Sequence, residues 1–278
     1  MTQLAGVLFD MDGTLVDSEK LWTIGLEELA IRHGGALSGT ARTAMVGSSM
    51  AESMRILHED IGQPGLSVAD SVEWLERRIE DLFTSDLIWR AGAQQLLHEL
   101  RAADLPMALV TATRRQLVEV ALLTIGADWF DAVVAGDEVG QTKPHPEPYL
   151  KAAAALGAEP GRCVAIEDSP NGVRSAAAAG CVVLAVPCEV DLTDLAVELN
   201  RRRALASVGR GGDRERFGGP GPAAETGRIG GAGGIGGAGG AGGAGGTVTV
   251  VDSLAGIGIP ELRHLVSTGS LPIVDTLR

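Results

Sequence analysis

Six short apolar runs recur along the chain, and segments with helical periodicity lie between them. The runs are rich in valine and do not alternate with polar residues, which is typical of parallel strands buried on both faces. They are LAGVLFD (4–10), MALVTA (107–112), AVVAG (132–136), CVAIED (163–168), CVVLAV (181–186) and TVTVV (247–251). Strands that alternate with helices predict an α/β fold with a doubly wound, Rossmann-like parallel sheet.

Four of the intervening segments carry apolar residues at helical spacing. They are GAQQLLHELRAAD (92–104), RRQLVEVALLTIG (114–126), PEPYLKAAAALG (146–157) and NGVRSAAAAG (171–180). Gly126 and Gly180 end two of them and are suited to close a helix at its C-terminus. We therefore expect crossover helices between the strands.

One segment interrupts the alternation. From Ser18 to Phe83 the sequence contains only helical patterns separated by turn residues. We interpret residues 18–88 as a helical cap domain inserted after the first strand, above the C-terminal edge of the sheet. The α/β core domain then comprises residues 1–17, 89–200 and 247–278.

The remaining residues, 201–246, are predicted to be a disordered Arg/Gly-rich insertion. Of the 39 glycines in the chain, 19 fall in residues 209–246. Within this window, residues 230–246 contain 12 glycines and lack the large apolar residues that a core needs. Because a strand pattern follows it, the window is an internal loop. Lengthening a loop from about 10 to about 50 residues costs only about 1.4 kcal/mol, so we expect residues 209–246 to be dispensable for fold and activity.

Charge and cysteine content exclude several classes of protein. The formal net charge of -13 offers no basic surface for nucleic acid or for anionic membranes. No signal sequence or membrane-spanning apolar stretch is recognisable. Cys163, Cys181 and Cys188 lack the spacing of a zinc site and form no paired framework. We expect a cytoplasmic protein that binds neither nucleic acid nor membranes.

Polar side chains gather where the predicted strands end. In open α/β sheets, ligands bind beyond the carboxyl ends of the strands. Singly, a threonine there is often a core hydroxyl and a loop lysine is often solvated, but these residues all converge on one edge. They are Asp10, Asp12, Thr111, Lys143, Glu167 and Asp168. Carboxylates, a hydroxyl and an ammonium form a set suited to a divalent cation and a phosphoryl group.

The sequence also resembles a known family at these positions. FDMDGTLVDS (9–18) is similar to the first motif of the haloacid dehalogenase superfamily in its phosphatase form, DxDGT. VTA (110–112) resembles the second motif and Lys143 in KPHPEPY the third. IEDSPNGVRSAAAAG (166–180) resembles the fourth in its ED variant. The resemblance covers nearly the whole chain outside the glycine-rich window.

This resemblance implies a two-step phosphoryl transfer. Asp10 is implied to be the nucleophile that forms an aspartyl-phosphate, and Asp12 the general acid and base. Two residues apart on an extended chain, both side chains point the same way, and Gly13 lets the chain turn away. Dehalogenases of the family lack an acid at the position of Asp12, so its presence favours phosphoryl transfer.

The resemblance also implies the ligands of the cofactor and of the phosphate. The cofactor is Mg²⁺, bound by the Asp10 side chain, the Asp12 backbone carbonyl and Asp168, with Glu167 binding directly or through water. The transferring phosphoryl group is implied to be held by Thr111, the amide of Ala112 and Lys143.

The ED variant and the small cap resemble the branch that holds β-phosphoglucomutases and sugar phosphatases. Mutases of this branch carry a histidine where this chain has Trp22, and a phosphate-binding arginine where it has Met50. Both departures favour a phosphatase. In the cap, Trp22 is either a stacking surface for a sugar ring or a core residue. A small polar loop is either a site for sugar hydroxyls or merely structural; it contains Gly47, Ser48 and Ser49.

We therefore predict a Mg²⁺-dependent phosphatase that hydrolyses a small phosphorylated metabolite, with a sugar or polyol phosphate favoured. One alternative is a β-phosphoglucomutase-like phosphomutase. The other is a non-catalytic binding protein that engages a partner through the glycine-rich loop.

Overall fold

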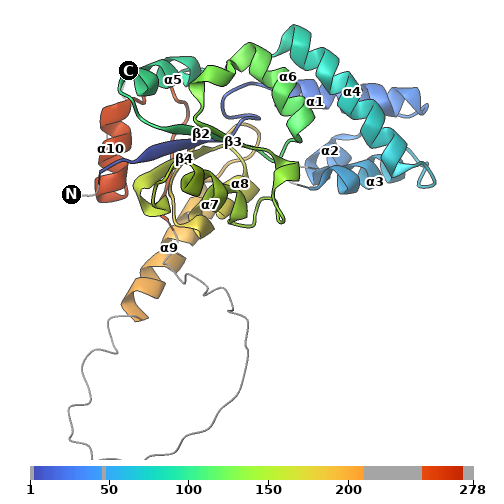
Figure 1. Ribbon diagram of the computed structural model, residues 1–278. Coiled ribbons are helices and arrows are strands. Elements are labelled where there is room, and N and C mark those ends of the chain that lie inside the picture. The colour runs from blue at the N-terminus through green and yellow to red at the C-terminus, as the bar shows by residue number, and fades with distance from the viewer. Residues whose placement is uncertain (1–2, 46–47, 210–245, 272–278) are drawn as a thin grey trace, which may run out of the picture.

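A single six-stranded parallel sheet forms the centre of the molecule in the computed structural model, which describes residues 3–45, 48–209 and 246–271 (Figure 1). The strand order is β3-β2-β1-β4-β5-β6, and each neighbouring pair is parallel. The strands are β1 (Gly6–Phe9), β2 (Met107–Val110), β3 (Ala132–Val134), β4 (Cys163–Glu167), β5 (Val182–Ala185) and β6 (Val248–Val250). All six coincide with predicted runs, so the doubly wound α/β fold is confirmed.

The central strand shows why the apolar runs do not alternate. β1 lies between β2 and β4, with Val7 opposite Met107 and Val164. Val7 and Phe9 point into one hydrophobic cluster, whereas Leu8 points into another on the opposite face of the sheet. Successive side chains of a strand alternate between faces, so a strand with both faces covered needs an apolar residue at every position.

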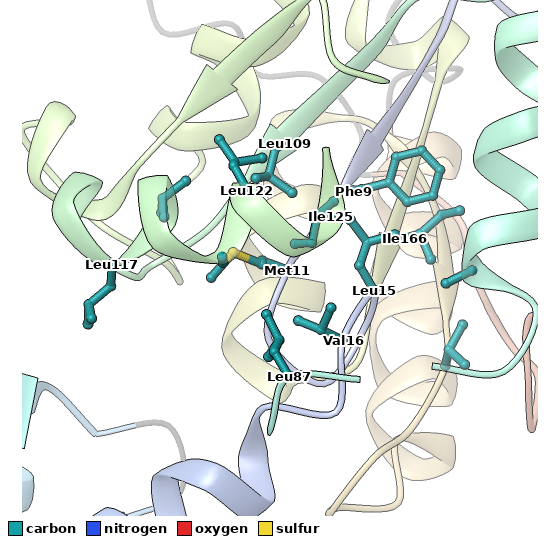
Figure 2. Close-up of a cluster of buried hydrophobic side chains, with 14 of the residues drawn as sticks. Phe9, Met11, Leu15, Val16, Leu87, Leu109, Leu117, Leu122, Ile125 and Ile166 are labelled. Atoms are coloured by element: carbon teal, nitrogen blue, oxygen red, sulfur yellow. The ribbon is translucent and has the colours of Figure 1, made fainter. Parts of the chain in front are cut away.

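Helices cover both faces. One face packs against α5 (Ala93–Ala102), α6 (Arg115–Ile125) and α10 (Ile259–Thr268). Figure 2 shows part of this cluster, where Leu122 and Ile125 of α6 lie near Leu109 and Phe9 of the sheet. The other face packs against α7 (Glu147–Ala155), α8 (Pro170–Ala179) and α9 (Thr193–Gly209). Three short 3₁₀ turns flank β3 and β4, at Ala127–Trp129, Gly136–Glu138 and Pro160–Arg162.

The segment between β1 and α5 is helical, as its sequence pattern predicts. It contains α1 (Glu19–Arg32), α2 (Gly39–Met45), α3 (Met50–Asp60) and α4 (Val68–Asp86). Gly25 lets α1 approach α4 closely, because a Cβ atom there would lie 2.8 Å from the Leu75 side chain. α4 also packs against α6, which joins the helical segment to the sheet layer (Figure 1). The division into a cap domain at 18–88 and a core domain stays a prediction.

The predicted start of the insertion, residue 201, is wrong. Residues 201–209 continue α9, because arginine, alanine and leucine are good helix formers. The Asn200 side chain donates to the Val248 carbonyl (2.7 Å) and accepts from the Val248 amide (2.9 Å), which ties α9 to the edge strand β6. The glycine-rich window thus stands in the chain between two elements of the fold, α9 and β6. Residues 210–245 themselves lie outside the described residues.

Gly246 limits what can be deleted from this window. A Cβ atom at Gly246 would lie 1.4 Å from the Cys181 carbonyl oxygen, and its amide donates to the Ala177 carbonyl. Since a helix rises about 1.5 Å per residue, Gly209 lies about 13 Å beyond Asn200 along α9. Joining the helix directly to residue 247 would therefore unwind its last turns.

We predict that replacing residues 210–245 with about six Gly/Ser residues leaves the fold intact. The sixfold shorter loop lowers the closure cost by about 1.6 kcal/mol. Thermal unfolding is expected to show an unchanged or slightly higher midpoint. A second variant without residues 209–246 and without a linker is expected to unfold at a lower temperature. A lower midpoint in the linker variant would show that the window contributes to the fold.

Candidate active site

The carboxyl ends of β1, β2 and β4 bring the predicted polar residues together. Beyond β1, the Asp10 amide donates to the Ile166 carbonyl (3.0 Å), and beyond β2 the Thr111 amide donates to the Val134 carbonyl (3.0 Å). Sheet hydrogen bonds thus hold both residues in place. A cavity of about 430 Å³ lies at this edge. Its lining includes Asp10, Asp12, Thr111, Ala112, Lys143 and Asp168, together with Trp22, Ser48 and Ser49.

Lys143 is buried between two carboxylates. Its Nζ donates to Asp10 Oδ1 (2.6 Å), to Glu167 Oε1 (2.6 Å) and to the Val110 carbonyl (2.9 Å). Burial alone would lower the pKa of Lys143, but the charges of Asp10 and Glu167 raise it above its usual value. Lys143 is therefore a permanent ammonium group in contact with the carboxylate at the end of β1.

Three buried carboxylates, those of Asp10, Glu167 and Asp168, crowd around this ammonium group. One oxygen of each lies within 4.8 Å of the others. Burial, opposed by Lys143 and reinforced by Glu167 and Asp12, raises the pKa of Asp10 to about 8. Burial, followed by the charges of Asp10 and Glu167, raises the pKa of Asp168.

The donor set of this cluster fits a hard divalent cation. Three carboxylates against one ammonium group leave an excess of two negative charges if all ionise. A divalent cation would balance that excess. Oxygen donors are the ligands that Mg²⁺ prefers. Of the three carboxylates, Asp10 and Asp168 line the cavity.

Glu167 is fully buried and does not line the cavity, and both of its carboxylate oxygens accept hydrogen bonds. Oε1 accepts from Lys143 and from the Tyr149 hydroxyl (2.7 Å). Oε2 accepts from the Asp168 amide (3.2 Å), the Ser169 amide (3.3 Å) and the Ser169 hydroxyl (3.1 Å). A Cβ atom at Gly172 would lie 1.8 Å from Oε1. This arrangement favours Glu167 as the group that holds Lys143.

The Asp12 carboxylate is held by four donors. Oδ1 accepts from the Ser18 hydroxyl (2.7 Å) and the Trp22 indole N–H (3.3 Å). Oδ2 accepts from the hydroxyls of Thr113 (2.7 Å) and Thr111 (3.2 Å). The sequence reading missed Ser18 and Thr113, although Thr113 stands two residues after Thr111.

The structure explains why glycine stands at position 13 and shows what the Trp22 side chain contacts. Gly13 has a φ of +75°, and a Cβ atom there would lie 2.0 Å from Asp168 Oδ2. The turn after Asp12 is thus open only to glycine, for its dihedral angle and for the proximity of Asp168. Trp22 contacts Asp12 and also packs edge-on against Phe83, with ring centroids 6.2 Å apart.

The helical segment closes the other side of the cavity. The Ser49 side chain caps α3 by accepting from the Glu52 amide, and the Ser48 and Ser53 hydroxyls lie 2.7 Å apart. Gly47 lies outside the described residues. The cavity lining also includes Glu19, Arg42 and Glu189, which the sequence reading did not single out. Burial, with the charges of Asp12 and Glu189, raises the pKa of Glu19 to about 7.

Comparison with known proteins places this geometry in a family. Residues 4–180 match the family model described as haloacid dehalogenase-like hydrolase. Hexitol phosphatase A of Escherichia coli is 36% identical over 67% of this chain and 84% of its own length. (DL)-glycerol-3-phosphatase 2 of Arabidopsis thaliana is 33% identical over 65% of this chain and 78% of its own.

The fold of this chain is also similar to that of a solved structure. CbbY from Rhodobacter sphaeroides in complex with phosphate is 28% identical, with a TM-score of 0.60 over 66% of this chain and 87% of that chain. Within the described residues, no helix is long and apolar enough to cross a membrane. The matched residues 4–180 include every carboxylate of the buried cluster, and the chain belongs to the haloacid dehalogenase-like hydrolases.

Proposed function

We propose that this hydrolase is a Mg²⁺-dependent phosphatase that cleaves a small phosphomonoester through an aspartyl-phosphate on Asp10. The observation that carries the proposal is the position of the Asp10 carboxylate. It lies in the cavity wall, 2.6 Å from the Lys143 ammonium group and within 4.8 Å of an Asp168 oxygen. A carboxylate in contact with an ammonium group is suited to approach an anionic phosphate.

The residues around Asp10 divide the chemistry. Asp10 attacks the phosphorus, and Asp12 protonates the leaving oxygen and later takes a proton from the attacking water. The Ser18 and Thr113 hydroxyls that contact Asp12 are able to donate or accept, so they can hold it in either protonation state. The non-bridging phosphate oxygens are held by Thr111, the Ala112 amide and Lys143.

A cation bound by Asp10, Asp168 and the Asp12 carbonyl would supply the positive charge that offsets repulsion between nucleophile and phosphate. Glu167 orients Lys143 toward Asp10, which keeps an ammonium group beside the reacting carboxylate.

The substrate we favour is a sugar or polyol phosphate. The relatives named above act on a hexitol phosphate and a glycerol phosphate by their names. A cavity of about 430 Å³ falls in the range of small-molecule sites, and Ser48 and Ser49 add hydroxyl groups to its wall. Met50 also lines the cavity and offers no charge for a second phosphate, which favours a phosphatase over a phosphomutase.

Substituting Asp10→Asn is expected to lower the rate of phosphate release from para-nitrophenyl phosphate by at least about a thousandfold. Asparagine keeps the size of the side chain but is a far weaker nucleophile. Thermal unfolding is expected to show a folded protein. Asp252→Asn, at an exposed position, is the matched control with unchanged activity. If the Asp10 variant retains turnover, Asp10 is not the nucleophile.

Mg²⁺ is expected to stabilise the fold, because it relieves repulsion within the buried carboxylate cluster. At a concentration of about 100 times Kd, binding stabilises by about 2.7 kcal/mol, which raises Tm by several degrees. The same ionic strength supplied as sodium chloride is the control. Asp168→Asn is expected to weaken the Mg²⁺-dependent shift. An unchanged Tm of the unsubstituted protein in Mg²⁺ would argue against a metal at this cluster.

Phosphatase and mutase activity differ in their products. With glucose 1-phosphate, a bisphosphate activator and Mg²⁺, we expect free phosphate and no glucose 6-phosphate. Screening sugar, polyol, nucleotide and amino-acid-derived phosphates then identifies the substrate class by phosphate release. Formation of the isomer would replace the phosphatase proposal with the mutase alternative.

A further inference from the structure

Arg42 lies in the wall of the cavity between two carboxylates. Its Nη2 donates to Glu189 Oε1 (2.7 Å) and to Glu19 Oε2 (3.2 Å), and its Nε donates to the Thr23 hydroxyl (3.0 Å). Arg42 comes from α2 and Glu19 begins α1, whereas Glu189 follows β5 in the sheet layer. The three charged side chains line the same cavity as Asp10 and Asp12.

Every cation in the described lining of this cavity contacts carboxylates. Lys143 contacts Asp10 and Glu167. Arg114 contacts the Glu76 carboxylate at 3.1 and 3.2 Å. Arg42 contacts two carboxylates. Apart from Lys143 beside Asp10, the cations in the described cavity wall are therefore already paired with carboxylates. A second phosphate would find no unpaired cation among them.

The same arrangement suits a neutral, hydroxyl-rich group. Carboxylate oxygens accept hydrogen bonds from hydroxyl groups, and a guanidinium group donates to hydroxyl oxygens. The wall thus presents a guanidinium donor, Arg42, between two carboxylate acceptors, Glu19 and Glu189. This pattern matches adjacent hydroxyl groups, each of which can donate and accept a hydrogen bond. The side chains are 28%, 19% and 34% exposed, respectively, so they are accessible but shielded from bulk water.

Building on the proposed phosphatase function, we propose that Glu19, Arg42 and Glu189 determine substrate specificity. They bind the hydroxyls of a neutral leaving group and reject a leaving group that carries a second phosphate. A phosphate dianion there meets the Glu189 carboxylate, and the Glu19 carboxylate whenever it is ionised, against one cation. Repulsion between like charges is strong in a partly desolvated cavity. The enzyme is thereby restricted to monophosphates of neutral polyols and sugars.

The test uses the full chain with Mg²⁺ and a matched pair of substrates that differ by one phosphate, fructose 6-phosphate and fructose 1,6-bisphosphate. Para-nitrophenyl phosphate, which has no sugar hydroxyls, reports on the phosphoryl chemistry. For the unsubstituted protein we expect kcat/KM for the monophosphate to exceed that for the bisphosphate at least about tenfold. This preference is expected to shrink at high salt, which screens partly exposed charges.

Two substitutions are expected to move this preference in opposite directions. Glu189→Gln keeps the shape of the side chain and removes one negative charge, so the bisphosphate-to-monophosphate ratio of kcat/KM is expected to rise at least about fivefold. Arg42→Gln removes the cation, and the same ratio is expected to fall. The matched control is Glu198→Gln, whose carboxylate pairs with Arg202 on α9; it is expected to leave the ratio unchanged.

The outcomes separate the two proposals. Equal losses on all three substrates in both variants would indicate a purely structural ion pair and overturn the specificity role. A protein that hydrolyses para-nitrophenyl phosphate but shows no preference between the two fructose phosphates would overturn the specificity role alone. Absence of phosphate release from all three substrates would overturn the phosphatase proposal and the inference with it. The substrate preference and its salt dependence are measured on the unsubstituted protein. They therefore test the specificity role even if a variant fails to fold.

Discussion

The ion pairs of Lys143 with Asp10 and Glu167 are the interaction on which the site depends. Buried charges are costly unless they are paired and hydrogen-bonded, and here one ammonium group serves carboxylates from two adjacent strands. Its third donor is used by the Val110 carbonyl of a third strand. The carboxyl ends of β1, β2 and β4 are thus tied together by a single side chain, and the parallel register of the sheet makes this possible.

The buried carboxylate cluster also leaves little space for neighbouring side chains. Gly172 leaves room for the Glu167 carboxylate at the start of α8, and Gly13 leaves room for Asp168 beside the turn after Asp12. A larger residue at either position would displace a carboxylate. The raised pKa values of Asp10 and Asp168 arise from burial first, which is typical of groups whose environment is organised for binding and catalysis.

The sequence predicted the sheet and the residues at its edge because both follow from local patterns. Unbroken valine-rich runs identify strands buried on both faces, and parallel strands place their carboxyl ends together. Contacts between segments far apart in the chain have no local sequence pattern that would predict them. The Arg42–Glu189 ion pair joins residues 147 positions apart, and the Thr113–Asp12 hydrogen bond joins residues 101 apart. The helical residues 201–209 were missed because neighbouring glycines dominated the composition of that segment.

The two ends of the cavity differ in how their charges are balanced. Near Asp10, carboxylates outnumber the ammonium group, which suits a site that gains a divalent cation and a phosphate together. Near Arg42, two carboxylates share one guanidinium group, and an uncharged ligand adds no further negative charge to them. The carboxylates of the first set come from strand ends, whereas the second set forms because Arg42 of α2 contacts Glu19 of α1 and Glu189 after β5. Sequence changes in the helical segment can therefore alter which leaving group is accepted while the sheet keeps the phosphoryl chemistry unchanged.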